Sequence, residues 1–399
     1  MLSIGTNYHL PKIQIWRLHL KRYDSMRVAI FTGNYNHIRD GVSLTLNRLV
    51  DFLQRNNVEV LVFGPTIPKP AFEHNGTLIA VPSIQMPGRP EYRITTGFPK
   101  EARERLEAFN PDLIHLATPD ILGIKALRWA EKNDVALVSS YHTHFSSYLK
   151  YYKLSIFVPF LWKFLSWFYG KCRQVYVPSK SMAEILVEKN IRANLKIWER
   201  GINSELFNPE KRSMEWRRKQ EIDDNDIVVT FVSRLVWEKN LRIFADIVNR
   251  LKDKYSNVKA MVVGEGPAQE EMMELLPNAI FTGFLKGDEL ATAYASSDIF
   301  FFPSDTETFG NVTLEAMASG LPAVVANATG SKSLVDHGEN GFRAAVEKSD
   351  KFFTLIEKLI TDQDLREQMS KASLEKSKKY SWESINGKLL GYYKEVLET

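Results

Sequence analysis

Two glutamates, Glu307 and Glu315, have the spacing and surroundings of a binding site in this 399-residue sequence. They lie eight residues apart within residues 305–320, DTETFGNVTLEAMASG. An apolar run just upstream predicts a buried strand, and residues 312–318 are typical of a helix that Gly320 caps. Glu307 is therefore expected on a strand-to-helix loop, and Glu315 on the first turns of the helix. The free N–H groups at the helix start favour an anionic ligand, whereas two solvated acids on a surface loop are the alternative.

A basic pair, Arg234 and Lys239, follows the apolar run at residues 228–232. Arginine presents a planar fork of donors and lysine a point charge, and together they suit a diphosphate. Among 52 lysines and arginines, such a pair arises several times by chance. Its position at the end of a predicted strand is what favours a functional role.

Two further candidates lie in the first half of the chain. His142 follows the predicted strand at residues 135–140, and its ring can donate a hydrogen bond to a sugar hydroxyl. For the neighbouring His144, a histidine satisfied within a turn is the favoured interpretation. Gly41 precedes a predicted helix and would let the backbone approach a phosphate closely, although an ordinary turn explains a single glycine equally well.

Composition and charge narrow the class of protein. Hydrophobic residues make up 44% of the chain and charged residues 25%, as in a soluble globular protein. The net charge of +4 is too small to indicate nucleic acid as a partner. Cys172 is the only cysteine, so no internal disulfide can form and a reducing, cytoplasmic compartment is expected. The histidines and Cys172 show no metal-ligand spacing, and residues 1–25 lack the features of a signal peptide.

Apolar runs alternate with helical periodicity in both halves of the chain, which predicts doubly wound parallel sheets with right-handed crossovers. Ligands of such sheets bind beyond the carboxyl ends of the strands, so the two halves should face a central cleft with these ends. The polar stretch at residues 203–226 is interpreted as the linker between the halves. Strands are expected at residues 27–32, 58–63, 112–117, 135–140, 175–179 and 195–198, and then at 227–232, 258–263, 280–282, 299–302 and 322–326.

The predicted organisation has four parts. Residues 1–25 form an N-terminal extension that is disordered or not translated, since Met26 is a second candidate initiator. An N-terminal Rossmann-like domain spans residues 26–203, and a C-terminal Rossmann-like domain spans residues 204–381. The last helix, 382–399, is expected to pack back on the N-terminal domain.

An aromatic segment at residues 154–169, LSIFVPFLWKFLSWFY, has two interpretations. It is too short to span a bilayer and is interrupted by Pro159 and Lys163. It could be an interfacial helix that inserts aromatic rings and pairs lysines with anionic lipid. The alternative, slightly favoured because a doubly wound domain needs a helix here, is a helix packed under the first sheet with only its lysines exposed.

Together these motifs resemble glycosyltransferase family 4, whose members are retaining, nucleotide-sugar-dependent enzymes with the GT-B fold of two Rossmann-like domains. The resemblance extends from Met26 to the end of the chain and is closest to GDP-mannose-dependent alpha-mannosyltransferases, with sulfoquinovosyl- and glucosyltransferases acting on lipids next. Asn203 departs from the family pattern, which usually has aspartate there. The motifs are Glu307-x7-Glu315, Arg234-x4-Lys239, VGEGP at 263–267, RDGVS at 39–43, SYHT at 140–143, RGIN at 200–203 and FTGF at 281–284.

The resemblance implies that residues 26–203 form the acceptor-side domain and residues 204–381 the nucleotide-sugar-binding domain. It also implies a role for each donor-side residue. Arg234 and Lys239 would hold the diphosphate and stabilise the leaving group, so neither a metal nor another cofactor is expected. Glu315 would accept hydrogen bonds from the ribose hydroxyls, and Glu307 would orient the donor sugar. The backbone of Thr308, Phe309, Gly310 and Asn311 would lie near the hydroxyls and phosphate of that sugar.

Three other roles are implied by the same resemblance. His142 would contact the donor sugar from the other domain, Gly41 would lie near the phosphates, and Leu285 would contact the base through its backbone. The two remaining partners would be a lipid or glycan acceptor and an anionic membrane surface touched by residues 154–169. The enzyme is therefore expected in the cytoplasm, peripheral on the inner face of the membrane.

The predicted function is retaining transfer of a hexose, with mannose first, from a nucleotide-diphosphate sugar such as GDP-mannose or a UDP-hexose to a lipid or glycan. A UDP-sugar-dependent lipid glycosyltransferase and a nucleotide-sugar epimerase on the same fold are the alternatives. A glycoside hydrolase using Glu307 and Glu315 is less favoured, because it would need the two carboxyls about 5–9.5 Å apart and no diphosphate clamp. A non-enzymatic membrane-binding protein is the least favoured.

Overall fold

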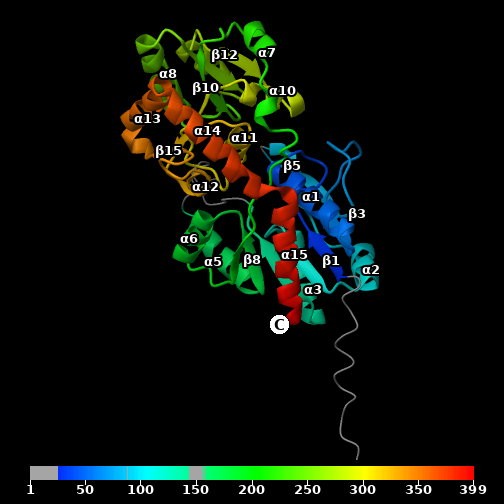
Figure 1. Ribbon diagram of the computed structural model, residues 1–399. Coiled ribbons are helices and arrows are strands. Elements are labelled where there is room, and N and C mark those ends of the chain that lie inside the picture. The colour runs from blue at the N-terminus through cyan, green and yellow to red at the C-terminus, as the bar shows by residue number, and fades with distance from the viewer. Residues whose placement is uncertain (1–25, 88, 143–155, 157) are drawn as a thin grey trace, which may run out of the picture. The chain divides into compact units, whose positions relative to one another are not determined.

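The computed structural model describes residues 26–87, 89–142, 156 and 158–399 (Figure 1). The expected N-terminal extension, the residues Thr143 and His144, and part of the aromatic segment lie outside the described residues. Two parallel sheets with flanking helices confirm the predicted α/β class. The described residues form two compact units: the first contains 26–116 and 120–136, and the second contains 117–119 and the rest from Leu137 onward.

The first sheet has seven strands in the order β3-β2-β1-β6-β7-β8-β9. Its inner strands β1, β6 and β7 are short apolar runs, buried on both faces as expected where helices cover both sides of a sheet. The strands are β1 (Met26–Phe31), β2 (Val58–Gly64), β3 (Thr77–Ala80), β6 (Leu113–Leu116), β7 (Ala136–Ser140), β8 (Gln174–Val177) and β9 (Leu195–Ile197). An antiparallel hairpin, β4 (Ser83–Met86) and β5 (Arg89–Thr95), follows β3.

The second sheet has six strands in the order β12-β11-β10-β13-β14-β15. The predicted ranges of β10, β11 and β13 are confirmed to the residue, whereas the edge strands β3 and β15 and the β4–β5 hairpin were not predicted. Strand β3 is short and only partly buried, so its apolar signal is weak. Strand β15 is mostly buried, but its sequence GFRA includes a glycine and an arginine, which weaken the apolar signal. The strands are β10 (Ile227–Val232), β11 (Val258–Val263), β12 (Ile280–Gly283), β13 (Ile299–Phe302), β14 (Ala323–Ala326) and β15 (Gly341–Ala344).

The helices follow the crossover positions of the two sheets. In the first unit these are α1 (Gly41–Arg55), α2 (Lys100–Phe109) and α3 (Ile121–Asn133). In the second unit they are α5 (Val158–Gly170), α6 (Lys180–Glu188), α7 (Met214–Lys219), α8 (Leu241–Lys254), α9 (Gln269–Leu275), α10 (Gly287–Ala295), α11 (Asn311–Ala318), α12 (Thr329–Leu334), α13 (Ser349–Thr361), α14 (Gln363–Ser377) and α15 (Trp382–Glu398).

The last helix, α15, packs on strands of the first sheet. The Arg173 guanidinium, just before β8, donates a hydrogen bond to the Val396 carbonyl at 2.9 Å. Lys196 of β9 forms an ion pair with Glu395 at 2.9 Å, and Tyr176 of β8 stacks on Tyr392. The residues from α13 onward thus begin beside the second sheet and end on β8 and β9 (Figure 1).

The segment that follows β9 is in direct backbone contact with the residues that lead into α15. The Ile202 N–H donates to the Tyr380 carbonyl at 2.6 Å, and Ile202 pairs with Ser381 in an isolated parallel bridge. A Cβ added at Gly201 would lie 2.4 Å from the Trp382 ring and 2.8 Å from its Cα. Only glycine allows this approach.

Replacing Gly201 with alanine is therefore expected to lower the free energy of unfolding by about 1–3 kcal/mol, because the new methyl group overlaps backbone and ring atoms. Gly391→Ala in α15 is a matched control, since no atom lies within 4 Å of its Cβ position. That control should gain about 0.5–1 kcal/mol from helix propensity. Urea unfolding of both variants measures the difference, and equal stabilities would contradict the close approach at Gly201.

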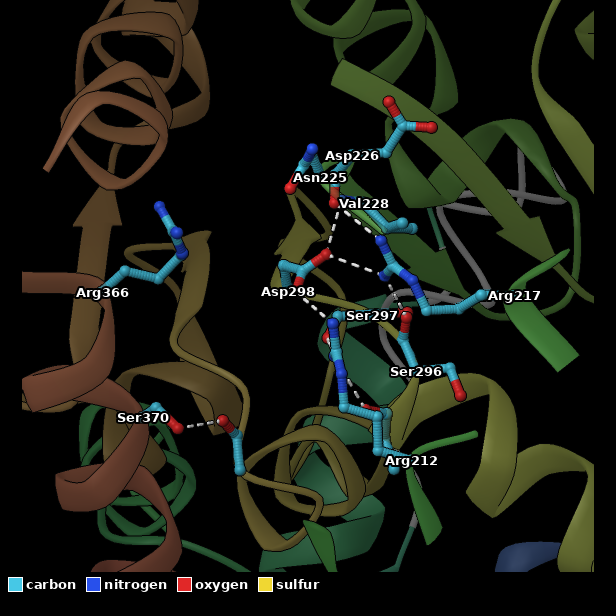
Figure 2. Close-up of polar contacts among 12 residues, drawn as sticks. Arg212, Arg217, Asn225, Asp226, Val228, Ser296, Ser297, Asp298, Arg366 and Ser370 are labelled. Atoms are coloured by element: carbon cyan, nitrogen blue, oxygen red, sulfur yellow. Dashed lines mark hydrogen bonds and ion pairs between the residues drawn. The ribbon is translucent and has the colours of Figure 1, made fainter. Parts of the chain in front are cut away.

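A buried arginine cluster ties α7 to the second sheet (Figure 2). Arg217 is fully buried, donates to the carbonyls of Ser296, Asp223 and Asp226, and forms an ion pair with Asp298 at 3.2 Å. The Asp298 carboxylate also accepts from the Val228 N–H at 2.8 Å and from the exposed neighbour Arg212 at 2.9 Å. The polar stretch at 203–226, expected to be a linker, thus supplies an interior side chain.

His115 in β6 is a histidine in the core of the first unit. Burial lowers its pKa to about 3, because the charged ring would lose its hydration there. An unfolded histidine titrates near pKa 6.5, so between these values the unfolded state binds one more proton. The contribution of neutral His115 to the free energy of unfolding is therefore fully present above about pH 6.5, and it decreases as the pH falls below that value.

Protonation of His115 in the unfolded state is expected to lower the free energy of unfolding by about 1.4 kcal/mol per pH unit between pH 6 and 4. His115→Gln removes this titration, so its unfolding free energy should fall less steeply with decreasing pH than that of the wild type. Urea unfolding at pH 7, 6 and 5 provides the two slopes, whatever the absolute stability of the variant. Parallel slopes would show that His115 does not titrate in this way.

Candidate functional site

The loops that follow β10, β11, β12 and β13 carry most of the predicted donor-binding residues. These four strands are neighbours in one parallel sheet, in the order β12-β11-β10-β13. Their carboxyl ends therefore lie along a single edge. Along it come first Leu285 after β12, then Arg234 and Lys239 after β10, and then Glu307 after β13.

The loops after β10 and β11 are in direct backbone contact. The Leu235 N–H donates to the Glu265 carbonyl at 2.9 Å. A Cβ at Gly264 would lie 2.0 Å from the Ser233 oxygen, and one at Gly266 would lie 2.3 Å from the Leu235 oxygen. The glycines of the VGEGP motif are therefore required by packing, and this packing fixes the backbone that carries Arg234.

The structure joins Lys239 to Glu307. Lys239 ends a short 3-10 helix, Trp237–Lys239, and its Nζ donates to Glu307 Oε1 at 2.5 Å and to Thr306 Oγ1 at 3.1 Å. The two charged side chains are only 18% and 20% exposed. Arg234 is exposed, and its guanidinium forms no hydrogen bond or ion pair within the described part of the chain. The edge thus offers an available guanidinium beside a partly buried lysine–glutamate pair.

The loop from Glu307 to Asn311 is positioned by a close backbone approach. The Gly330 N–H donates to the Glu307 carbonyl at 2.9 Å, and a Cβ at Gly330 would lie 2.3 Å from the Phe309 backbone. The Phe309 ring is buried and makes a T-shaped contact with the Tyr380 ring. Gly330 was not identified from the sequence, where a single glycine between Thr329 and Ser331 gives no distinguishing signal.

Helix α11 begins beside this loop. Gly310 precedes it with a φ of 99°, a conformation that favours glycine, and offers no side chain to cap the helix. The first N–H groups of a helix have no partner within the helix, so those of Asn311 and Val312 are placed to meet an anion. The Thr308 carbonyl accepts from Ser179 Oγ at 3.0 Å, which holds the loop on the side of β8.

Glu315 lies on α11 and is oriented by a tyrosine of α10. The Tyr294 hydroxyl donates to Glu315 Oε2 at 3.0 Å. Burial, together with the charge of Glu315, raises the pKa of Tyr294 well above its usual value, so the tyrosine remains a donor. Tyr294 was not predicted as part of the site.

Leu285, which is predicted to contact the base, follows a tight turn. Gly283 has a φ of 69°, and the Phe284 N–H donates to Glu265 Oε1 at 3.2 Å. Phe284 is 68% exposed, whereas Leu285 is half-buried. Glu265 of the VGEGP motif therefore fixes the backbone at Phe284, next to Leu285.

His142 lies after β7 with both ring nitrogens engaged. Arg200 Nη2 donates to His142 Nδ1 at 2.7 Å, and Ser140 Oγ lies 2.7 Å from Nε2. A guanidinium can only donate, so Nδ1 carries no proton and the neutral ring has its proton on Nε2. Burial lowers the pKa of Arg200 to about 10, which leaves it charged at neutral pH. A sugar hydroxyl would have to exchange with one of these partners.

Gly41 is the one predicted residue in the first unit, where it begins α1. The Asp40 carboxylate accepts from the Ser43 N–H at 2.8 Å, and Ser43 Oγ accepts from the Asp40 N–H at 3.0 Å. Asn34 also donates to Asp40, at 2.9 Å. These bonds fix the loop that leads into α1. The roles of Gly41 and of the other predicted site residues stay predictions.

Two doubly wound parallel sheets give the chain the GT-B fold. Sucrose-phosphate synthase from Thermosynechococcus elongatus superposes with a TM-score of 0.76 at 17% identity, over 94% of this chain and 99% of that one. The family model described as "Glycosyltransferase Family 4" matches residues 39–206, and the one described as "Glycosyl transferases group 1" matches residues 213–376.

The chain belongs to glycosyltransferase family 4 and is a hexosyltransferase. It is 30% identical to the GDP-mannose-dependent alpha-mannosyltransferase of Corynebacterium glutamicum, over 93% of this chain and 89% of that protein. It is also 30% identical to the sulfoquinovosyl transferase SQD2 of Arabidopsis thaliana, over 91% of this chain and 72% of that protein.

Helix α5 contains most of the aromatic segment. Leu165, Phe168 and Tyr169 are buried, but Phe160 is 67% and Trp167 is 42% exposed. The helix therefore does not expose only its lysines. Within the described ranges, no helix combines the length and apolarity needed to cross a membrane.

Proposed function

We propose that this enzyme transfers a hexose, with mannose as the first candidate, from a nucleotide-diphosphate sugar to a lipid or glycan acceptor, with retention at the anomeric carbon. The observation that carries the proposal is the order of groups along one sheet edge. A turn suited to a base, a guanidinium and lysine suited to a diphosphate, and a carboxylate suited to a sugar follow one another there. The mannosyltransferase relative supports mannose and GDP.

In the proposed reaction, the bond between the anomeric carbon and the diphosphate oxygen breaks through an oxocarbenium-like state. The acceptor oxygen forms the new bond on the same face, and its proton goes to the departing diphosphate oxygen. Arg234 and Lys239 would stabilise the charge that develops there, which is the largest electrostatic contribution expected. Because these two side chains supply the positive charge, we infer that the transfer requires no metal.

Lys239 also links donor binding to the sugar-side carboxylate. Its Nζ is held by Glu307 and Thr306, so a bound diphosphate competes with Glu307 for the lysine. Release of Glu307 would make its carboxylate available to the hydroxyls of the sugar. Binding of the complete donor is thus proposed to rearrange this pair.

Calorimetric titration with GDP and UDP tests the nucleotide, and product formation from GDP-mannose or UDP-glucose with a lipid acceptor tests the transfer. Tighter binding of GDP, and a product that keeps the donor's anomeric configuration by NMR, are expected. Preference for UDP would favour the UDP-sugar-dependent lipid glycosyltransferase, which the sulfoquinovosyl transferase relative supports. Conversion of the donor alone into another sugar would instead identify an epimerase.

We further propose that the enzyme is a peripheral protein of the cytoplasmic membrane surface and that α5 touches this surface. Phe160 and Trp167 are exposed, and Lys163 lies between them on the same helix. Exposed aromatic rings insert into the headgroup region while lysines contact anionic lipid. Sedimentation with phosphatidylglycerol vesicles should exceed that with phosphatidylcholine, and Phe160→Ser with Trp167→Ser should reduce it. Equal sedimentation of variant and wild type would contradict the contact.

A further inference from the structure

The first unit has a pocket of its own, which shares no residue with the loops predicted to bind the donor. It has a volume of about 570 Å³, which lies within the range of small-molecule sites. Ile79, Val81 and Pro82 form an apolar wall where β3 leads into β4, and Ala102 in the first turn of α2 faces them. Arg93 and Arg105 also line it.

Arg93 is held in place by one serine. Its Nε donates to Ser83 Oγ at 2.7 Å, and its Nη2 donates to the Ser83 carbonyl at 2.9 Å. A guanidinium has five N–H donors, so three are left after these two bonds. Within the described residues, Arg93 forms no ion pair with a carboxylate. Arg93 is therefore a cation with a fixed orientation and three N–H groups that can bind a ligand.

The second cation, Arg105, comes from α2. Its side chain is exposed and makes no hydrogen bond or ion pair in the part of the chain that the structure describes. The acidic lining residue is Glu101, one turn earlier on the helix, and it does not pair with Arg105 there. Two guanidiniums against one carboxylate leave the lining with a net positive charge. Planar guanidinium forks bind phosphate oxygens in pairs, which lysines cannot do.

A buried acceptor in the same unit lies behind the lining residue Thr66, although His37 itself does not line the pocket. His37 Nδ1 is 3.3 Å from the Pro65 carbonyl, and the following residue, Thr66, lines the pocket. An Nδ1–H bond to Pro65 leaves Nε2 as an acceptor, and this atom is buried without a hydrogen-bond partner within the described residues. Burial, together with the nearby charge of Arg93, lowers the pKa of His37, so the ring stays neutral. A hydroxyl group would satisfy Nε2.

We propose that this pocket binds the phosphate of a phosphorylated polyol, and that this group is the headgroup of the lipid acceptor. Arg93 and Arg105 hold the phosphate, the apolar wall covers the adjoining carbons, and a hydroxyl lies on the Thr66 side of the pocket. The assignment of the group to the acceptor rests on the proposed function. The proposed binding of a phosphate in the pocket does not depend on the proposed function.

Isothermal titration of the full-length protein with sn-glycerol 3-phosphate, inorganic phosphate and glycerol tests the pocket. Glycerol 3-phosphate should bind more tightly than inorganic phosphate, and glycerol should not bind. Arg93→Gln and Arg105→Gln should each weaken binding at least about tenfold, the loss expected for a hydrogen-bonded charge. Arg103→Gln, on α2 but outside the lining, is the matched control. No binding by the wild type, or equal binding by all variants, overturns the proposal.

Transfer kinetics distinguish a lipid headgroup from a soluble phosphate. With phosphatidylglycerol vesicles as acceptor, Arg105→Gln should raise KM about tenfold and leave kcat and GDP affinity unchanged. If glycerol 3-phosphate binds at the pocket but the KM for vesicles does not change, the acceptor assignment is overturned. If neither GDP nor UDP binds the wild type while glycerol 3-phosphate still binds, the proposed function fails and the pocket stands. Arg105 is exposed, so its variant should fold even if loss of Arg93 loosens the hairpin.

Discussion

Lys239→Ala is expected to lower kcat for hexose transfer by about 10²- to 10³-fold, the effect of removing one preorganised group from a developing negative charge. Lys239 lies in the loop after β10, at the end of a short 3-10 helix, where its Nζ donates to the Glu307 carboxylate at 2.5 Å. Its removal withdraws one of two cations from the diphosphate. It also leaves Glu307 without its ion-pair partner, so the carboxylate would repel the phosphates.

The fold should survive this change. The Lys239 and Glu307 side chains keep some contact with water, so the loss of their pair should cost only about 1 kcal/mol of stability. Lys348→Ala, an exposed lysine of the same unit, is the matched control and should retain full activity. Steady-state kinetics with donor and acceptor at saturation provide kcat, and thermal unfolding checks the fold. Turnover at the wild-type rate by Lys239→Ala would rule out the proposed role.

Asp298→Ala is expected to cost about 3–5 kcal/mol of unfolding free energy, because it leaves the Arg217 guanidinium buried without its carboxylate. Three groups lose the Asp298 carboxylate as a partner (Figure 2). The distances to its oxygens are 3.2 Å from the Arg217 guanidinium, 2.9 Å from the Arg212 guanidinium and 2.8 Å from the Val228 backbone nitrogen. Arg217 is fully buried, so water cannot replace the lost carboxylate without opening the packing between α7 and the sheet.

Asp246→Ala offers a comparison at the surface of the same unit. Its ion pair with Arg250 spans 3.4 Å, and both side chains are largely exposed, so about 0.5 kcal/mol or less should be lost. Urea unfolding followed by tryptophan fluorescence measures both variants. Similar midpoints for Asp298→Ala and Asp246→Ala would show that the Arg217 cluster contributes little to stability.

The features of the site that follow from local sequence patterns could be predicted. The strands β10 and β13 are continuous apolar runs, so the positions of Arg234, Lys239 and Glu307 at strand ends followed from the runs alone. The helix expected at 312–318 begins one residue earlier, at Asn311. The aromatic segment could not be assigned in this way, because its composition suits both a packed and an exposed helix.

The sequence by itself determined the α/β class, the alternation of strands and helices in two halves, and which charged residues end the strands, because these features arise from local periodicity. Only the tertiary structure decided which groups meet. Lys239 and Glu307 lie 68 residues apart, and Arg217 and Asp298 lie 81 apart. Gly330 must be glycine because the distant Phe309 backbone crosses it. Such contacts depend on how the sheet edges and helices pack, and no local pattern of residue types encodes that packing.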